Sequence, residues 1–236
     1  MRLKSDQRSD VGRVRKRNED CCYSNPQLGL FIIADGMGGH PAGDVASRLA
    51  VETLRKILEV REAFAKPQEI PQRLEQAFQQ TNQVIISAGR SNSQWHNMGT
   101  TASAAVVSEG RAFTANVGDS RIYLLQNGSL RQCSKDHNPI GPALFDGKIQ
   151  RLSNILTQAI GLDQPLDLYQ QQFALQPGDR LLLCTDGLNN MLSDSEIRRV
   201  LIQSESPGET CKKLVRQANN QGGHDNISVI VVDILN

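Results

Sequence analysis

An apolar run at residues 28–34 leads directly into an acidic, glycine-rich loop, and this combination constrains the fold more than any other feature. The run predicts a buried β-strand. It is followed by Asp35 and then by Gly-Met-Gly-Gly-His, a tight loop with little side-chain bulk. Asp35 can offer two oxygens to a cation, and Gly36, which has no Cβ, can turn its carbonyl toward the same ion. A single motif of this kind also fits an ordinary glycine turn between a strand and a helix.

Composition indicates a globular protein of the cytoplasm. Hydrophobic residues make up 39% of the 236 residues and the net charge is only +1, so the chain can bury a sizeable core and has no overall charge to recruit nucleic acid or an anionic membrane. The five cysteines are odd in number and form no C-x-x-C pair, which favours free thiols in a reducing compartment. No apolar run approaches the ~18 residues of a membrane span or resembles a signal peptide. We expect a single domain over residues 1–236, with neither nucleic acid nor membrane as a partner.

The order of strand and helix patterns predicts an α+β fold. Helices are expected after Pro41 and Pro71, and two more begin at Ser193 and Ser206, each followed three residues later by a capping glutamate. Strands are expected at residues 3–11, 21–24, 28–34, 100–108, 111–117, 121–126, 129–133, 168–175, 180–185 and 226–235. Short turns such as Asn127-Gly128 favour hairpins, and hence an antiparallel meander across residues 100–133. The predicted arrangement is a central sandwich of two antiparallel β-sheets covered by helices.

Four acidic motifs share one design. They are Asn18-Glu19-Asp20, Asp35-Gly36, Thr185-Asp186-Gly187 and His224-Asp225-Asn226. Each lies beside the end of a predicted strand, and strand ends from one sheet can converge on one edge, so we expect these carboxylates to gather there. Clustered carboxylates repel unless a cation neutralises them, and oxygen ligands without zinc-type histidine spacing favour Mg²⁺ or Mn²⁺. Two such ions about 3.5–4 Å apart can share a carboxylate and activate a water for attack on phosphate.

These motifs, taken with others in order along the chain, resemble a known family. The set comprises Arg15-x-x-Asn18-Glu19-Asp20, Asp35-Gly36-Met37-Gly38-Gly39-His40, Gly99-Thr100-Thr101, Gly118-Asp119-Ser120-Arg121, Asp136-His137, Leu156-Thr157-x-Ala159-x-Gly161, Thr185-Asp186-Gly187-Leu188 and Asp225-Asn226-Ile227-Ser228. It covers nearly the whole chain and is similar to the bacterial branch of the metal-dependent protein phosphatases, the type 2C protein serine/threonine phosphatases. The resemblance implies hydrolysis of phosphoserine and phosphothreonine in proteins by a water that bridges two metal ions.

The resemblance also implies a sandwich with helices on both outer faces and roles for single residues at one sandwich edge. Asp35 would bridge two Mg²⁺ or Mn²⁺ ions, and the Gly36 carbonyl would bind one of them. Asp186 and Asp225 would bind the other ion. Asp20 would hold metal-bound waters.

Further positions complete the implied site. Arg15 would clamp the substrate phosphate with its planar guanidinium, and a solvated basic loop is the alternative interpretation of this residue. Asp119 matches the position of a third, more weakly bound metal ion, but Asn190 stands where bacterial relatives usually carry an acid, which would weaken that third site. Prolines and glycines punctuate residues 134–168, so we expect an irregular flap there, at about residues 137–167.

Protonation of the leaving group has two candidates, His40 as general acid and a metal-bound water. A cysteine nucleophile is disfavoured, because Cys184 lies in a predicted core strand without an evident histidine partner.

An alternative function, a phosphoprotein-binding regulatory module without turnover, predicts lost metal ligands, but Asp35, Asp186 and Asp225 are all present. Nucleic-acid binding through residues 13–17 predicts a basic face with aromatics, yet aromatics make up only 4% of the chain. We expect a monomer that acts on phosphorylated proteins.

Overall fold

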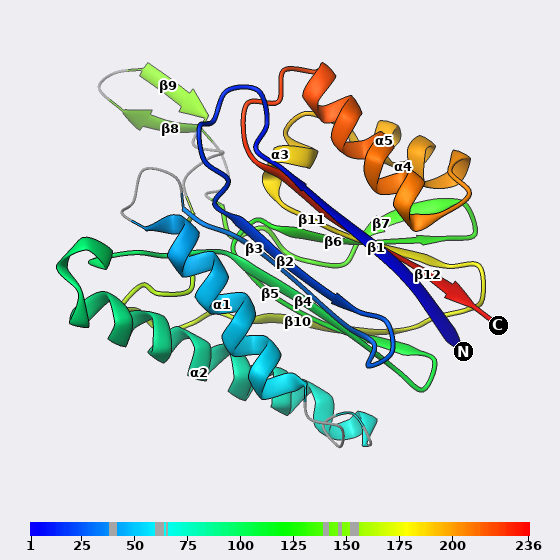
Figure 1. Cartoon of the computed structure of the whole chain (residues 1–236), viewed down its shortest axis with the longest axis horizontal. Coiled ribbons are helices and arrows are strands. Elements are labelled where there is room, and N and C mark those ends of the chain that lie inside the picture. Colours follow the sequence, from blue (N-terminus) through cyan, green and yellow to red (C-terminus); the bar gives the residue numbers. More distant parts are fainter. Residues whose placement is uncertain (38–41, 60–63, 65, 139–141, 146–147, 152–155) are drawn as a thin grey trace.

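Two antiparallel five-stranded sheets form the centre of the molecule (Figure 1). The structure is a computed structural model and describes residues 1–37, 42–59, 64, 66–138, 142–145, 148–151 and 156–236. In spatial order, the "β12 sheet" contains β1 (Arg2–Asp10), β12 (Ile227–Leu235), β11 (Arg180–Cys184), β6 (Arg121–Gln126) and β7 (Ser129–Gln132). The "β3 sheet" contains β10 (Tyr169–Ala174), β5 (Arg111–Val117), β4 (Ala102–Ser108), β3 (Leu30–Asp35) and β2 (Asp20–Asn25).

Helices cover the outer face of each sheet. The helices α1 (Gly43–Leu58) and α2 (Ile70–Ser91) pack on the β3 sheet, whereas α4 (Asp194–Gln203) and α5 (Pro207–Asn220) pack on the β12 sheet. Two short 3-10 helices, η1 (Pro67–Glu69) and η2 (Ser93–Trp95), flank α2. The predicted sandwich with helices on both outer faces is therefore confirmed. Where the chain is described, no helix is both long and apolar enough to cross a membrane.

The β3 strand shows how the sequence builds these layers. Phe31 and Ile33 belong to the apolar core between the two sheets, whereas Leu30 and Ile32 belong to the core beneath α1 and α2. All four side chains are fully buried. Successive side chains of a strand point to opposite faces, so a strand with a core on each side needs apolar residues at every position. This explains why residues 28–34 form a continuous apolar run.

The predicted meander is wrong at one junction. Strands β4 and β5 form one hairpin and β6 and β7 form another, but β5 and β6 belong to different sheets. The chain crosses between the sheets at residues 118–120, where Gly118 adopts a φ of 97° that glycine tolerates best. A Cβ atom on Gly118 would also lie 2.5 Å from Cγ2 of Thr101. The crossing leaves Asp119 between the ends of β5 and β6.

Of the two predicted capping boxes, the one at α4 has both of its hydrogen bonds and the one at α5 has one of the two. At α4, the Ser193 side chain accepts from the Glu196 N–H while the Glu196 carboxylate accepts from the Ser193 N–H. At α5, the Ser206 side chain accepts from the Glu209 N–H. The Glu209 carboxylate, however, accepts from the N–H of Glu205 at 3.1 Å.

A two-stranded hairpin and a helix of one turn lie outside the sequence prediction. The strands β8 (Pro142–Phe145) and β9 (Lys148–Arg151) form a hairpin within the segment expected to be irregular. The helix α3 (Asp186–Asn189) follows β11 directly. An element of one helical turn is too short to show a periodic hydrophobic pattern, and this is why the sequence does not reveal α3.

Candidate metal centre

Four of the predicted acids gather at one end of the sandwich. Asp35 ends β3 and Asp20 begins β2, and the two residues are directly paired. Asp186 begins α3 after β11, and Asp225 lies just before β12. The acids therefore come from both sheets, so the expectation that strand ends of one sheet supply the cluster is wrong. The Thr185 hydroxyl links the two sheets by donating a hydrogen bond to Oδ2 of Asp20 at 2.9 Å.

The backbone around Asp35 is held from two directions. Its N–H donates to the Thr101 hydroxyl at 3.0 Å, and its carbonyl accepts from the Thr100 hydroxyl at 2.7 Å. A Cβ atom on Gly36 would lie 2.2 Å from the carbonyl oxygen of Gly43. Glycine at this position thus has a packing reason in addition to the predicted freedom of its carbonyl, because it lets the end of β3 meet the start of α1.

Burial and mutual repulsion raise the pKa values of these carboxyl groups. Burial is the main cause of the rise in the pKa of Asp20 to about 7. Burial, followed by the charge of Asp225, raises the pKa of Asp186 to about 6. The pKa of Asp35 is raised well above its ordinary value by burial and then by the charges of Asp20 and Asp186. Such a cluster holds protons near neutral pH unless a cation replaces them.

The chemistry of the cluster fits a divalent cation. Oδ1 of Asp20 and Oδ1 of Asp186 are buried and accept no hydrogen bond from the residues that the structure describes, and a buried anionic oxygen is costly unless a donor or a cation meets it. In the described part of the chain, no three Asp, Glu, His or Cys side chains are arranged to hold an ion unaided. Ions such as Mg²⁺ keep several waters and need only one or two carboxylates, so the cluster suits a hydrated ion with oxygen ligands.

Arg15 lies at the rim of the carboxylate cluster. Its Nη2 atom donates to Oδ2 of Asp225 at 2.7 Å, and its side chain remains 44% exposed. An exposed guanidinium held at the edge of an acidic site can still meet an incoming anion. The structure thus brings the predicted phosphate clamp next to a predicted metal ligand.

Asn226 holds this rim together, a role that the sequence does not reveal. Its Nδ2 atom donates to the carbonyls of Val11 and Arg17 at 2.9 Å each, and its Oδ1 atom accepts from the Glu19 N–H at 2.8 Å. One amide side chain therefore ties the loop that carries Arg15 to the segment that carries the predicted ligand Asp225. The sequence feature that could have indicated this role is the amide residue directly after Asp225, the acid of the last motif.

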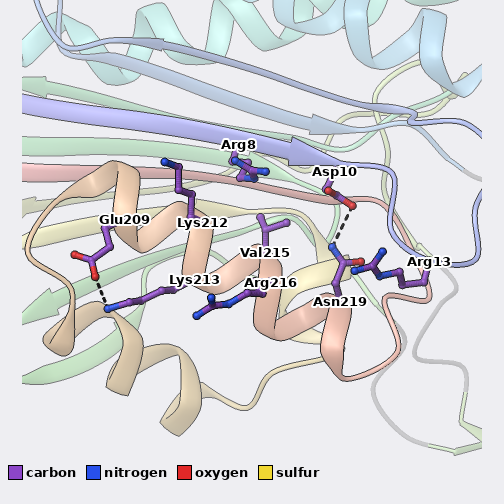
Figure 2. Close-up of a pocket in the computed structure, with 9 residues that line it drawn as sticks. All are labelled: Arg8, Asp10, Arg13, Glu209, Lys212, Lys213, Val215, Arg216 and Asn219. Carbon is purple, nitrogen blue, oxygen red and sulfur yellow. Dashed lines mark hydrogen bonds and ion pairs between the residues drawn. The ribbon is translucent and has the colours of Figure 1, made fainter.

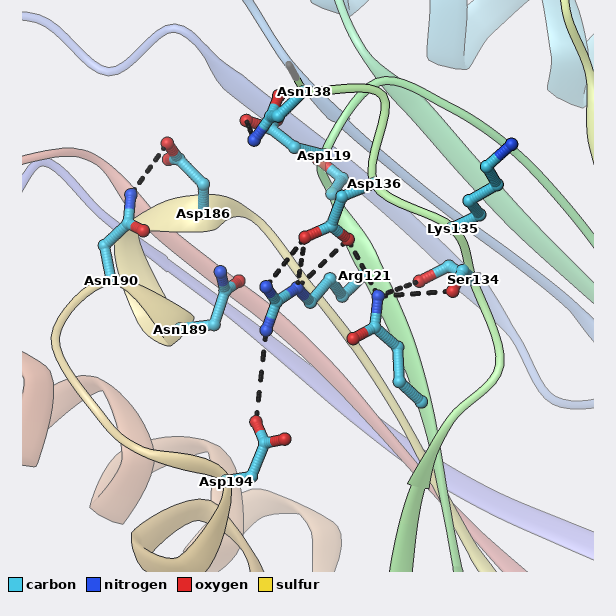
Figure 3. Close-up of polar contacts among 12 residues, drawn as sticks. Asp119, Arg121, Ser134, Lys135, Asp136, Asn138, Asp186, Asn189, Asn190 and Asp194 are labelled. Carbon is cyan, nitrogen blue, oxygen red and sulfur yellow. Dashed lines mark hydrogen bonds and ion pairs between the residues drawn. The ribbon is translucent and has the colours of Figure 1, made fainter. Parts of the chain in front are cut away.

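Asp119 belongs to the same electrostatic cluster (Figure 3). The side chain is only 7% exposed, and Nδ2 of Asn138 donates to its Oδ2 atom at 3.4 Å. Burial and then the charge of Asp186 raise its pKa to about 7. On the other side of Asp186, Nδ2 of Asn190 donates to Oδ2 at 3.0 Å. The structure therefore puts the neutral Asn190 amide in direct contact with a predicted metal ligand.

A second ionic contact braces this region. Arg121 binds Asp136 through Nε and Nη2, with the shortest distance 2.7 Å from Nη2 to Oδ2 (Figure 3). The Nη1 atom of Arg121 donates to the Tyr123 hydroxyl at 2.7 Å. Nearby, Nδ1 of His137 accepts from the Gly118 N–H at 3.0 Å. Together these contacts fasten the chain after β7 to the sheet crossing beside Asp119.

The predicted general acid His40 lies outside the described residues, as do Gly38 and Gly39 of the same motif. The other predicted site residues are all described. The structure gathers Asp20, Asp35, Gly36, Asp119, Asp186, Asp225 and Arg15 at one end of the sandwich.

Comparison with known proteins gives one consistent family. The family described as Protein phosphatase 2C matches residues 13–221. The chain is 37% identical to "Serine/threonine phosphatase stp" of Listeria welshimeri, over 96% of this chain and 94% of that protein. Among solved structures, PppA of Pseudomonas aeruginosa is 36% identical, with a TM-score of 0.85 over 99% of this chain and 98% of that one. The catalytic domain of the phosphatase PstP, in complex with two manganese ions, is 32% identical, with a TM-score of 0.85 over 100% and 99% of the two chains.

Proposed function

This chain belongs to the protein phosphatase 2C family and is a serine/threonine protein phosphatase, and from that membership we propose how its own residues act on a phosphoprotein. The observation that carries the proposal is the meeting of Asp35 with Asp20, Asp186 and Asp225 between two sheets. Arg15 at the rim adds a cation that can meet phosphate. Carboxylates for metal ions and a guanidinium for the substrate are the two components that metal-assisted phosphate hydrolysis needs.

Divalent metal ions are the cofactors supported by the family and by the manganese-bound PstP structure. In our proposal Asp35, the Gly36 carbonyl, Asp186 and Asp225 would hold two Mg²⁺ or Mn²⁺ ions, with Asp35 as the ligand common to both. Asp119 would contribute to a third, weaker site. Bound cations of this kind lower the pKa of water and offset the negative charge of the phosphate. The buried Oδ1 atom of Asp186, which accepts no hydrogen bond from the described residues, supports this assignment.

The protein's own groups orient the reactants in this proposal. Arg15 binds two phosphate oxygens with its planar fork, after exchanging its contact with Asp225 for the substrate. Asp20 accepts from Thr185 through Oδ2 and keeps Oδ1 available to hold a water near the cluster. His40 donates the proton that the departing serine or threonine oxygen needs.

The proposed substrates are proteins that carry phosphoserine or phosphothreonine, and the proposed working form is a monomer with one catalytic domain over residues 1–236. The cytoplasm is the proposed compartment, since all five cysteines are free thiols. A phosphoprotein-binding module without turnover gains no support, because the predicted ligands Asp35, Asp186 and Asp225 are all present.

The test compares wild type with Asp186→Ala on p-nitrophenyl phosphate and on a phosphothreonine peptide, in EDTA and in Mn²⁺. We expect turnover that requires Mn²⁺ and is lost in the variant, together with weaker Mn²⁺ binding by calorimetry. Asp163→Ala is the matched control, because Asp163 is exposed and pairs only with Arg90 among the described residues. Turnover in EDTA, or full activity of Asp186→Ala, would refute the assignment.

A further inference from the structure

A basic groove lies between β1 and α5, outside the candidate metal centre (Figure 2). Its volume is about 540 Å³, and it is lined by Arg8, Asp10, Arg13, Glu209, Lys212, Lys213, Val215, Arg216 and Asn219. Five of these side chains are cations and two are carboxylates, a local excess of +3 on a chain whose total net charge is +1. The groove, which we call the β1–α5 groove, therefore concentrates positive charge that the rest of the surface cancels.

The spacing of the basic residues creates this concentration. Lys212, Arg216 and Asn219 lie four and three residues apart on α5, so they share one face of the helix. Arg8 and Asp10 are two residues apart on β1 and share one face of the strand. The groove is thus formed by one helix face and one strand face.

Both carboxylates of the groove already have partners. Glu209 pairs with Lys213 at 2.5 Å. Oδ1 of Asp10 accepts from Nδ2 of Asn219 at 3.1 Å and from the Gly12 N–H at 2.9 Å.

The remaining cations of the groove have no carboxylate partner among the described residues. Arg8, Arg13, Lys212 and Arg216 are exposed, and none forms an ion pair within the part of the chain that the structure describes. A concave surface with several unpaired cations attracts an anionic partner.

The groove is connected to the candidate metal centre through one loop. The N–H of Arg13 donates to the Gly223 carbonyl at 2.8 Å, and a Cβ atom on Gly12 would lie 2.2 Å from the Asp225 carbonyl oxygen. Arg15 follows Arg13 by two residues, a backbone span of at most about 7 Å. A chain bound along the groove and past Arg13 therefore approaches the guanidinium proposed to receive the phosphate.

We propose that the β1–α5 groove docks an acidic segment of the phosphoprotein substrate, beside the phosphorylated residue that Arg15 receives. This inference rests on the proposed phosphatase function. A peptide fits better than nucleic acid, because none of the nine lining residues is an aromatic on which a base could stack. It also fits better than a membrane, because Val215 is the only apolar side chain in the lining and a membrane-binding surface needs a larger apolar face.

The experiment measures kcat/KM for two phosphothreonine peptides that differ only in their flanks, one rich in glutamate and one neutral. The groove variant is Lys212→Gln/Arg216→Gln. Its control is Lys56→Gln/Arg199→Gln, which removes the same two charges from exposed helix positions outside the groove. Glutamine keeps helix propensity near that of lysine and arginine, so both variants should fold alike. Hydrolysis of p-nitrophenyl phosphate, which has no peptide flank to bind in the groove, reports on the metal centre alone.

We expect wild type to prefer the acidic peptide and the groove variant to lose about fivefold in kcat/KM for it. Neutral-peptide and p-nitrophenyl phosphate rates should stay unchanged, as should every rate of the control variant, and added salt should weaken the wild-type preference. Equal hydrolysis of both peptides by wild type would overturn docking alone, whereas no hydrolysis of either would overturn the phosphatase function with it. Variant-sensitive binding of an RNA oligonucleotide or of phosphatidylserine vesicles, with unchanged peptide preference, would reassign the groove to that ligand and overturn the proposal.

Discussion

Asp20 and Asp35 are direct partners across the antiparallel pairing of β2 and β3, and both side chains lie partly buried at the sandwich edge. Like charges placed opposite each other destabilise a sheet. The pair therefore destabilises the fold unless a proton or a cation neutralises one of the two carboxyl groups. In the metal-free protein this repulsion lowers the free energy of unfolding, and the same arrangement holds the carboxylates in place for a cation.

Asp35→Asn should stabilise the metal-free protein while it abolishes activity. Removing one of two opposed carboxylates relieves repulsion of about 1 kcal/mol, which corresponds to a rise in Tm of about 3 °C for a chain of this size. Thermal unfolding in EDTA measures the first effect, and Mn²⁺-dependent hydrolysis of p-nitrophenyl phosphate measures the second. Asp163→Asn, at an exposed site, is the control. A lower Tm in EDTA would contradict the repulsion.

The stability of the metal-free protein should fall as the pH rises from 5 to 8. The pKa values of Asp20 and Asp119 are raised to about 7 and that of Asp186 to about 6, whereas an unfolded aspartate has a pKa of about 4. Between these values the folded state binds more protons than the unfolded state, so the free energy of unfolding decreases with pH.

Urea denaturation in EDTA across this pH range checks the expectation. Mn²⁺ should remove the decline, because the cation replaces the protons. Asp20→Asn should also flatten the curve, since it deletes one of the groups that titrate. Equal stability of the metal-free wild type at pH 5 and pH 8 would show that the carboxylates titrate normally.

Local patterns in the sequence predict the strands and the two hairpins, β4 with β5 and β6 with β7, but not that the two hairpins belong to different sheets. The limits of β5 and β6 agree with the predicted ranges, since alternation and turn residues act over short distances. The crossing at Gly118 depends instead on the packing of Thr101 against it. A contact between residues far apart in sequence has no local signature, so the sequence suggested a meander at that junction.

The same contrast applies to the candidate site. Asp35 and Asp186 can be predicted because an acid between an apolar strand and a glycine is unusual. The bracing role of Asn226 and the ion pair of Arg121 with Asp136 cannot be predicted in this way. Polar side chains of these types are common on surfaces, and only the folded arrangement shows that they hold a loop.

Asn190→Asp should tighten metal binding. The Asn190 amide now donates to Oδ2 of Asp186, and a carboxylate in its place would add negative charge where the third metal ion is proposed. We expect a lower Mn²⁺ concentration for half-maximal activity, by about tenfold, and lower stability in EDTA. Asn189→Asp adds the same charge one residue away and is the control. If Asn190→Asp and Asn189→Asp both needed the same Mn²⁺ concentration as wild type for half-maximal activity, that result would argue against a third site at Asp119.

Arg15→Ala should impair substrate binding but not metal binding. Loss of charge-assisted hydrogen bonds to phosphate costs about 1.5–3 kcal/mol, which lowers kcat/KM for a phosphothreonine peptide by roughly 10- to 150-fold. Mn²⁺ affinity should be equal or slightly higher, since Asp225 loses its competing partner. Arg15→Lys should recover only part of the activity, because an ammonium lacks the planar fork.

Arg17→Ala is the matched control for Arg15, as it removes an exposed cation from the same loop without touching Asp225 in the structure. Its kcat/KM should remain near the wild-type value. Equal losses in the Arg15→Ala and Arg17→Ala variants would indicate that the loop acts through its general positive charge rather than through one phosphate clamp.

Gly187→Ala should move the predicted metal ligands Asp186 and Asp225 away from each other. A Cβ atom on Gly187 would lie 1.9 Å from the carbonyl oxygen of Asn226, so the start of α3 must move away from the segment before β12. That movement takes Asp186 away from Asp225. We expect a loss of about 2 kcal/mol in the free energy of unfolding and a clear loss of Mn²⁺ affinity, measured by urea denaturation and calorimetry.

Gly178→Ala distinguishes this steric effect from the general cost of replacing a glycine. Gly178 has a φ of 95°, and a Cβ atom there would have no neighbour within 4 Å. Its substitution should cost about 1 kcal/mol through backbone strain alone and leave Mn²⁺ affinity unchanged, because the turn lies at the opposite end of β11 from Asp186. If Gly187→Ala bound Mn²⁺ as tightly as Gly178→Ala, the close approach of α3 to Asn226 would have no part in holding the metal ligands together.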